Sequence, residues 1–340
     1  MIFRMSLRGH KLLRSSVLFL LLSIFVSPRL DAKYNEIQKT ETRVYAVSAG
    51  TEFVMLTDDG DIRLHTWDKD SIRIEIVKHA RGRTERKAKL MLEKISIDVR
   101  SSEKRLVLQE HYQDKDDFSI LDLFEPANWH ERKRIDYKVI VPQGLICKIK
   151  HDDGDILAEN IRGSVHISLD EGEVQLSNLV FNTCRVEIDE GKLLLKRMTG
   201  EKNSEMQLYC DEGVIHLDSV SVDQVNIEVD EGRVRMKNAD IDRFECLIDE
   251  GHIHAEIYPD VHGRYILSCS EGDIAVTLLN QVPMRVAIYC EDGRITSNLG
   301  LKIRRSEESE QVRGSLGEPA DAYFKLYTDE GDIQFDLYSE

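Results

Sequence analysis

Apolar and polar residues alternate along most of this chain, in short runs on either side of a recurring turn of two acidic residues and a glycine. Around the turn at Gly172, the alternating apolar residues are Val165, Ile167, Leu169, Val174 and Leu176. Alternation with a period of two predicts strands that bury one face. The phase shifts by one residue across the turn, which indicates a strand that bends through a corner and keeps its apolar side inward.

The acidic turn recurs through most of the sequence. Its glycines are Gly60, Gly154, Gly172, Gly191, Gly213, Gly232, Gly251, Gly272, Gly293 and Gly331. The spacing is nearly constant from Gly154 to Gly293, and the last interval, to Gly331, is about twice as long. A fixed period of roughly 20 residues indicates repeated units that must stack to bury their apolar faces. Glycine supplies the positive φ of the corner, and a preceding Asp can bond nearby backbone N–H groups.

We therefore predict an all-β fold: a parallel β-solenoid with coils of roughly 19–22 residues and a small mixed N-terminal cap region. Successive coils would lie about 4.8 Å apart, the ordinary distance between strands. An antiparallel meander of hairpins is the alternative. The near-constant period favours the solenoid, because stacked coils place like residues above one another.

The period is interrupted between Gly60 and Gly154. In this interval we expect strands at residues 72–76, 95–99, 106–108 and 137–141, and a helix within 83–94. The predicted organisation is a targeting segment at 1–32, a strand and cap region at 33–146, and the repeats at 147–340. A polar loop at 304–319 interrupts the last, double-length coil, and we expect it to be mobile.

An insertion at residues 114–134 carries apolar and aromatic residues among acids. Its candidate partner-binding residues are Phe118, Leu121, Phe124 and Trp129. Exposed aromatic residues of this kind are unusual on a lone monomer and indicate a docking segment. A loop that folds back over the cap is the alternative.

The N-terminal segment 1–30 is basic, with Arg and Lys side chains and no acid, and it contains an apolar run at 17–26. The run has the length of a signal-peptide core and is too short to span a membrane, so we predict the secretory pathway and no membrane span in the mature chain. A mitochondrial presequence is the alternative. The sequence contains no N-x-Ser/Thr glycosylation site.

All six cysteines occupy inward positions of the repeats, where a free thiol behaves as a small apolar residue. They are Cys147, Cys184, Cys210, Cys246, Cys269 and Cys290. We expect free thiols in the core. Disulfides are the alternative, because Cys269 and Cys290 would face each other if their coils stacked directly.

The formal net charge is −16, and the acids that precede the turn glycines account for all of the excess, since without them it is +3. Stacked coils would align these carboxylates in a ladder. The candidate Ca²⁺ ligands are Asp170, Glu171, Asp189, Glu190, Asp211, Glu212, Asp230, Glu231, Asp249 and Glu250. Acids that form turns and face solvent are the alternative. Nucleic acid is not an expected partner, because its binding requires a basic surface.

No motif of a nucleophile, phosphate loop or dinucleotide site occurs, so we predict neither an enzyme nor a bound organic cofactor. The motifs Asp59-Gly60-Asp61-Ile62, Asp153-Gly154-Asp155-Ile156 and Asp329 to Ile333, with Trp67-Asp68 and Tyr137 to Pro142, resemble those of a family of adhesin candidates. These are β-solenoid domains of unknown function in bacteria and some eukaryotes. The resemblance covers roughly residues 44–340 and implies a surface or scaffold role.

The function that we predict is a non-enzymatic, adhesin-like binding or scaffold module that acts through its acidic turns and its aromatic loop. Its partner would be a protein or a glycan. A Ca²⁺-dependent structural protein and a β-helix enzyme that acts on glycans are the alternatives.

Overall fold

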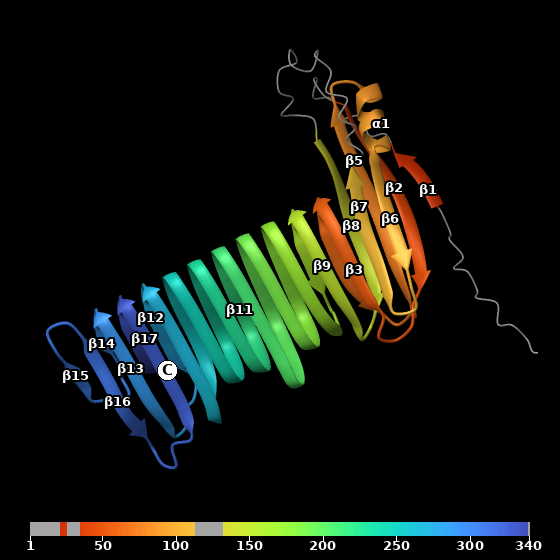
Figure 1. Ribbon diagram of the computed structural model, residues 1–340. Coiled ribbons are helices and arrows are strands. Elements are labelled where there is room, and N and C mark those ends of the chain that lie inside the picture. Colours follow the sequence, from red (N-terminus) through yellow and green to blue (C-terminus); the bar gives the residue numbers. More distant parts are fainter. Residues whose placement is uncertain (1–20, 26–34, 113–131, 339–340) are drawn as a thin grey trace, which may run out of the picture.

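The computed structural model describes residues 21–25, 35–112 and 132–338. It shows a rod of stacked strands that joins a taller sheet region at one end (Figure 1). The all-β prediction is confirmed, and α1 (Glu85–Glu93) is the one helix within the described ranges. The sheet is mixed: its strands pair in parallel along the rod and in antiparallel fashion toward both ends.

The rod winds from one coil to the next along successive parallel pairs. Its strands are β3 (Glu52–Asp59), β4 (Ile62–Trp67), β9 (Leu145–Asp153), β10 (Ile156–Glu159), β11 (Gly163–Glu271), β12 (Ile274–Leu278), β13 (Met284–Asp292), β14 (Ile295–Thr296), β17 (Ala322–Glu330) and β18 (Ile333–Leu337). The long strand β11 continues through several coils (Figure 1). Val165 pairs with Cys147 and Val174 with Ile156, so one coil advances by the same step that separates Gly154 from Gly172.

The turn glycines form a column because each lies against the backbone of the coil before it. Gly172 has φ 141°, and a Cβ placed there would overlap the carbonyl oxygen of Gly154. Gly191 is related to Gly172 in the same way, and Gly213 to Gly191. The corner therefore demands glycine twice, once for its φ and once for the close approach of two backbones.

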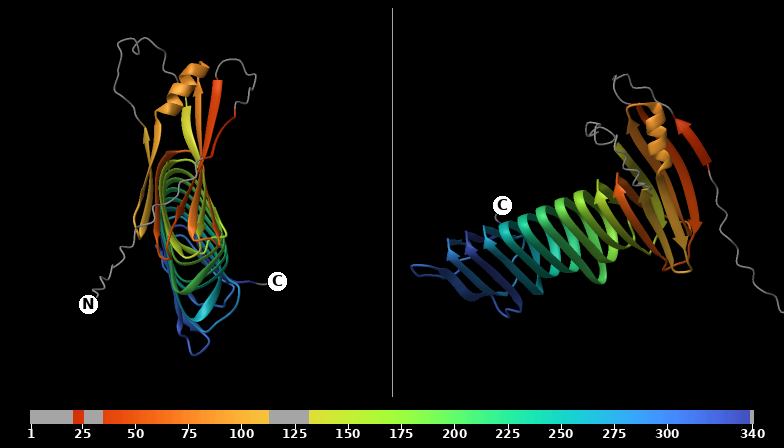
Figure 2. Two further views of the ribbon diagram at one scale, coloured as in Figure 1. Left: turned by 90° about the vertical axis from the view of Figure 1, so that its right-hand side faces the viewer. Right: turned by 45° about the horizontal axis from the view of Figure 1, so that its top comes forward.

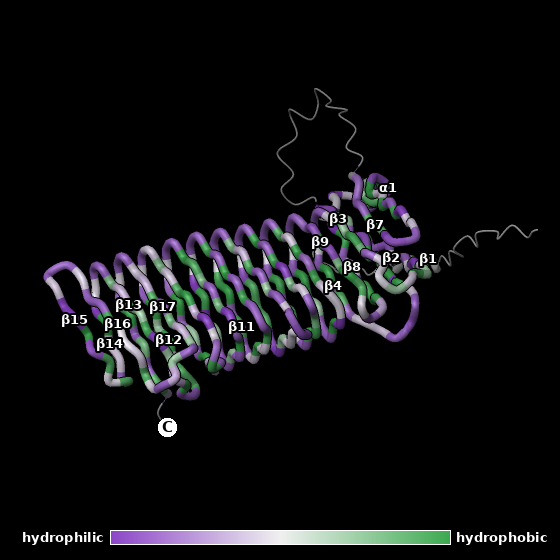
Figure 3. Tube along the Cα trace, turned by 60° about the horizontal axis from the view of Figure 1, so that its bottom comes forward, coloured by the Kyte–Doolittle hydropathy of each residue, from purple (hydrophilic) through white to green (hydrophobic). Residues whose placement is uncertain are grey.

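The inward residues of the coils form one continuous apolar core. Val165, Ile167 and Leu169 are each at most 2% exposed. Figure 3 shows the result along the chain, with hydrophobic stretches in the strands and a hydrophilic row of turns along one edge. Near the far end the core contains larger rings, and Tyr265 stacks on Phe324 with centroids 4.2 Å apart.

The N-terminal region extends the two faces of the rod as separate sheets. It comprises β1 (Leu21–Phe25), β2 (Asn35–Ala46), β5 (Ser71–Gly82), α1, β6 (Ile95–Ser101), β7 (Arg105–Tyr112) and β8 (Arg132–Pro142). Strand β7 continues one face by pairing with β3, while β8, β5 and β2 continue the other from β4. Figure 2 shows the two sheets diverging, with α1 at their far end. The coil of Gly60 belongs to the rod, because it stacks directly on the coil of Gly154 despite the long interval in sequence.

The helix expected within residues 83–94 is present as α1. Thr84 caps its N-terminus, where the Thr84 hydroxyl oxygen accepts a hydrogen bond of 3.2 Å from the backbone N–H of Lys87. Ala88 and Leu92 are buried against the strands below. The strands expected at 72–76, 95–99, 106–108 and 137–141 lie within β5, β6, β7 and β8.

The order of coils at the C-terminal end differs from the order in sequence. Strand β17 lies between β11 and β13, since Tyr323 is the register partner of both Arg264 and Arg285. Gly331 therefore stacks on Gly272, and Gly293 stacks on Gly331. The prediction of a mobile loop at 304–319 is wrong. Strands β15 (Ile303–Arg305) and β16 (Glu310–Leu316) form a hairpin, and β16 pairs antiparallel with the outer edge of β13. The backbone groups at the edge of β13 pair with β16, so this polar segment forms a strand that its sequence did not predict.

All six cysteines are free and buried. Thr328 is the register partner of both Cys269 and Cys290, so the coil of β17 separates the two thiols. A disulfide between them is excluded by this order.

The candidate partner-binding residues Phe118, Leu121, Phe124 and Trp129 lie outside the described residues. Residues 132–134, at the end of the expected insertion, belong to β8. Part of the apolar run at 17–26 forms β1, which pairs antiparallel with β2. Across the described ranges, no helix is both long enough and apolar enough to cross a membrane.

Candidate functional site

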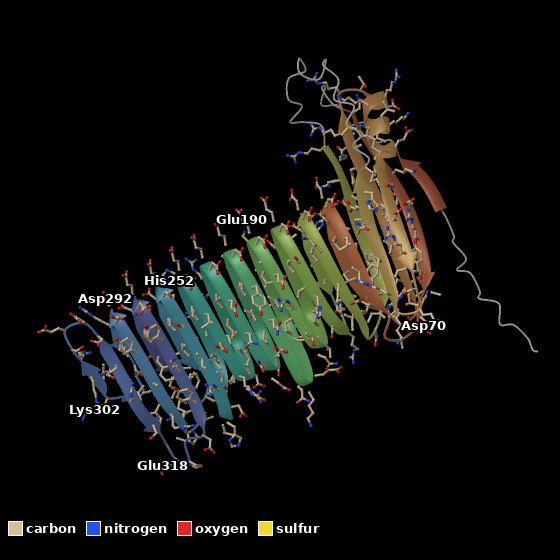
Figure 4. All side chains as sticks on the ribbon, viewed as in Figure 1. Asp70, Glu190, His252, Asp292, Lys302 and Glu318 are labelled. Atoms are coloured by element: carbon tan, nitrogen blue, oxygen red, sulfur yellow. The ribbon has the colours of Figure 1, made fainter. Side chains whose placement is uncertain are left out.

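The acids that precede the turn glycines align along one edge of the rod, which we call the acidic edge. Glu171 is the register partner of Asp153, Glu271 of Glu330, and Asp292 of Glu330. All ten candidate Ca²⁺ ligands, from Asp170 to Glu250, lie on this edge and are exposed. Figure 4 shows Glu190 and Asp292 on the same edge, with carboxylate oxygens projecting from successive turns.

The acidic edge is electrostatically unfavourable for the folded chain. Partial burial, followed by the charges of Asp170 and Asp211 on neighbouring coils, raises the pKa of Asp189. Burial and the charge of Asp153 do the same to the pKa of Asp59. Two carboxylates about 4.8 Å apart repel by roughly 1 kcal/mol in water. The alignment thus has a small cost that a bound cation or cationic partner would reduce.

Within the ranges 21–25, 35–112 and 132–338, no group of three or more His, Cys, Asp or Glu side chains is arranged to hold a metal ion. Calcium binding by the ten acids stays an untested hypothesis, beside the alternative of turn acids that face solvent.

A second set of acids, directly after the turn glycines, has a different environment. The Asp155 carboxylate accepts a hydrogen bond of 3.2 Å from the backbone N–H of Glu173. The Asp273 carboxylate accepts one of 2.8 Å from the N–H of Asp332. These acids satisfy backbone donors of the next coil and help to build the corner, whereas the acids before the glycine point outward.

Several polar side chains that lie three positions before a turn glycine form hydrogen bonds with the turn of the neighbouring coil. The Cys269 thiol donates to the Gly251 carbonyl at 3.3 Å, and the Thr328 hydroxyl donates to the Gly272 carbonyl at 3.0 Å. His151 is fully buried, with Nε2 2.7 Å from the Gly60 carbonyl oxygen and Nδ1 2.9 Å from Thr57 Oγ1. Their role is structural, because each satisfies a carbonyl of the glycine column.

The structure also shows a basic cluster on the outer face of β3, β9 and β11 that was not predicted from the sequence. Lys148, Lys150, His166 and Arg185, which we call the basic depression, line a hollow of about 320 Å³ over Val54 and Leu56. The signal was available, since Lys148, His166 and Arg185 each lie six residues before a turn glycine.

A second corner of the coils, six residues after the turn glycine, also has a sequence signal: an asparagine. Asn160, Asn178 and Asn238 lie six residues after a turn glycine and have φ of 55°, 55° and 52°. Asparagine tolerates this left-handed conformation better than most residues. The side-chain amide of Asn178 donates to Oδ1 of Asn160 at 3.2 Å, which links two coils.

Comparison with known proteins places this architecture in a family. Residues 50–335 match the Toastrack family DUF4097, and the chain belongs to this family. None of the curated proteins matches the chain in sequence. Family membership carries no activity with it.

Among solved structures, the chain is similar to an adhesin candidate from Parabacteroides distasonis, with 8% identity and a TM-score of 0.34, covering 87% of this chain and 97% of that one. It is similar to an adhesin candidate from Parabacteroides merdae, with 8% identity and a TM-score of 0.31, covering 91% and 98%. It is also similar to a candidate lipid-binding protein from Parabacteroides distasonis, with 12% identity and a TM-score of 0.27, covering 88% and 97%.

Proposed function

We propose that the protein is a non-enzymatic binding module that engages a basic protein partner along its acidic edge. In this proposal the rod is a parallel β-solenoid whose coil length follows the spacing of the turn glycines, and the N-terminal region of β2, β5, α1, β6, β7 and β8 caps it. The aromatic insertion at 114–134 provides a second contact. The observation that carries the proposal is the alignment of exposed, like-charged side chains on successive coils.

Across the residues that the structure describes, the ten candidate acids of this edge have no direct ion-pair partners. In the described part of the chain, none of the ten acids from Asp170 to Glu250 forms an ion pair within 4.0 Å of a basic side chain. A partner that carries Lys or Arg at strand spacing would relieve the repulsion at each coil it covers. Such binding is spread over many weak contacts, and it weakens as salt rises.

The compartment proposed is the secretory pathway, on the evidence of the basic N-terminal segment and its short apolar run. Mass spectrometry of the protein from its native source tests this by locating the mature N-terminus. A start near residue 33 supports a removed signal, and an intact Met1 contradicts it.

The binding experiment uses a fluorescent octalysine peptide and the full chain. Replacing Asp189, Glu190, Asp211 and Glu212 by their amides should weaken binding about tenfold, because four favourable charge contacts are lost. The matched control replaces Asp70, Glu93, Glu103 and Glu318, which are exposed acids away from the edge; Figure 4 shows Asp70 and Glu318 on the opposite side of the molecule from Glu190. The control has the same net charge and should bind nearly as well as the wild type. Equal losses in the two variants would contradict a specific edge.

A further inference from the structure

The basic depression contains three basic residues in one row across neighbouring coils. His166 is the register partner of Lys148, and a hydrogen bond between Thr183 and Ser164 places Arg185 beside His166 on the next coil. When His166 is protonated, neighbouring charges in this row are about one strand spacing, 4.8 Å, apart, a distance at which like charges destabilise a sheet. A row of this kind needs anionic partners.

The protein supplies partners for the two outer members of the row. Lys148 Nζ lies 2.5 Å from a carboxylate oxygen of Glu52. Arg185 pairs with Glu187 at 2.5 Å and donates to Gln207 at 2.7 Å. Both cations are therefore held in place from the sides of the depression.

Two basic groups of the depression, the Lys150 ammonium and the His166 ring, have no such partner. Among the described residues, neither Lys150 Nζ nor the His166 ring makes a hydrogen bond or ion pair. Burial, followed by the charges of Lys148 and Arg185, lowers the pKa of His166. These effects disfavour the protonated ring, and an anion beside it would favour that form.

The floor of the depression is apolar although it belongs to the outer face. Val54 is 6% exposed, and it is the register partner of Lys148, as Leu56 is of Lys150. The volume of about 320 Å³ is at the small end of the range for ligand sites. Glu187 also lines the hollow, where Arg185 pairs with it. An apolar floor and a rim on which Lys150 and His166 lack anionic partners fit a ligand with a compact, partly apolar body and one acidic group.

We propose that the basic depression binds a small ligand through a carboxylate or phosphate group, with Lys150 and His166 as its contacts. Lys148 and Arg185 strengthen the local positive field. Long polyanions are excluded by the neighbouring acids, because Asp170 and Asp189 lie only a few residues further along the same coils. The site is distinct from the acidic edge and takes a ligand of opposite charge.

The test is a nuclear magnetic resonance titration of the His166 ring in the full chain. Glucuronate and inorganic phosphate are the two probes, and glucose is the uncharged control. Saturable shifts of the His166 ring signals with either anion, together with a higher titration midpoint, are expected. A response to glucuronate alone assigns a carboxylate, and a response to phosphate alone assigns a phosphate. Absence of a saturable shift with both anions overturns the proposal.

Two variants separate a built site from general attraction to cations. Lys150→Met should weaken the binding at least fivefold, since it removes the one unpaired lysine of the rim. Arg264→Met removes an exposed cation from the far end of the rod and should leave the binding unchanged. An equal loss in both variants would show that the depression has no specificity of its own.

Discussion

The N-terminal region and the rod bury polar groups in different ways. Between the antiparallel strands of the N-terminal region, Glu41, Lys78 and Glu110 are 8%, 8% and 5% exposed. In the rod, the buried polar residues of the described chain are His151, Ser204 and Thr328, together with Thr51 and Thr57 near its junction with that region, and none of them is an acid or a lysine.

Repetition explains the difference. Each rod position faces the same position of the next coil, so a buried charge would meet another member of its own row rather than a partner of opposite sign. Thr328 and His151 form hydrogen bonds with carbonyls of the glycine column, and Ser204 Oγ accepts a hydrogen bond of 3.1 Å from the backbone N–H of Asp223. The N-terminal strands are not repeats and can place individual partners: Lys78 Nζ, for example, donates to the Ile95 carbonyl at 3.0 Å. A stacked fold thus selects apolar interiors and places its charges outside.

The largest predicted effect is on the glycine column. Gly172→Ala should destabilise the protein by about 3–5 kcal/mol, because the new Cβ is strained at this φ and overlaps the backbone of the Gly154 coil. Urea denaturation measures the change. Gly50→Ala is the control in the N-terminal region: its φ is 75°, but a Cβ there meets no atom within 4 Å. It should cost only about 1–2 kcal/mol, and a similar cost for both variants would remove the distinction.

The next effect concerns a carboxylate that joins the two regions. Asp136 on β8 lies 2.9 Å from His79 Nε2 and accepts a hydrogen bond of 3.2 Å from the backbone N–H of Asp61. Burial alone would raise its pKa, but these bonds lower the pKa overall. Asp136→Asn should therefore cost about 1–3 kcal/mol at pH 7.

The pH dependence of the stability loss in Asp136→Asn tests whether the ionised carboxylate stabilises the folded protein. A depressed folded pKa gives the wild type an advantage that is complete above the unfolded value near 4 and is lost as pH falls through the folded value. Denaturation at pH 7, 5 and 3 should show the two proteins converging at the acidic end. A constant difference across this range would mean that the carboxylate charge contributes nothing.

On the acidic edge, replacing an Asp by Asn should raise the stability of the protein instead of lowering it, and the effect should be smaller. The raised pKa of Asp189 means that its ionised form is disfavoured in the folded protein. Asp189→Asn should stabilise the protein at pH 7 by a few tenths of a kcal/mol, because the residue is exposed and screened by solvent. The gain should vanish below about pH 4, where both states of the wild-type acid are protonated. Asp218→Asn is the control, since hydrogen bonds led by Ser219 lower the pKa of Asp218 and the sign should be opposite.

The smallest expected effect is that of calcium. Thermal melts in EDTA and in millimolar Ca²⁺ should agree within about 1 °C, since exposed carboxylates on a solvated edge bind divalent ions weakly. A saturable rise of several degrees that Mg²⁺ does not reproduce would instead establish a calcium site among the turn acids.

Most of the fold could be predicted from the sequence, because each repeat has the same residues at the same positions. Alternating apolar residues around Gly172, the acidic turn and the phase shift at each corner predicted all-β structure and a buried face. The helix was readable from the charged, helix-forming residues at 83–94, and Thr84 supplies its cap. For the basic depression the sequence shows only a row of basic residues six positions before successive turn glycines, and the hollow that Lys150 and His166 line exists only once the coils stack.

The amino-acid sequence alone determined what one coil needs: an apolar inner side, a glycine at the corner and acids that leave the turn outward. These are local requirements of φ, of side-chain size and of solvation. The tertiary structure alone decided which coil touches which. Gly60 stacks on Gly154 across the intervening N-terminal strands, and β17 enters between β11 and β13 ahead of its place in sequence. Parallel strands with the same repeat can pair in more than one order, and the choice among orders depends on contacts between distant segments that no local pattern records.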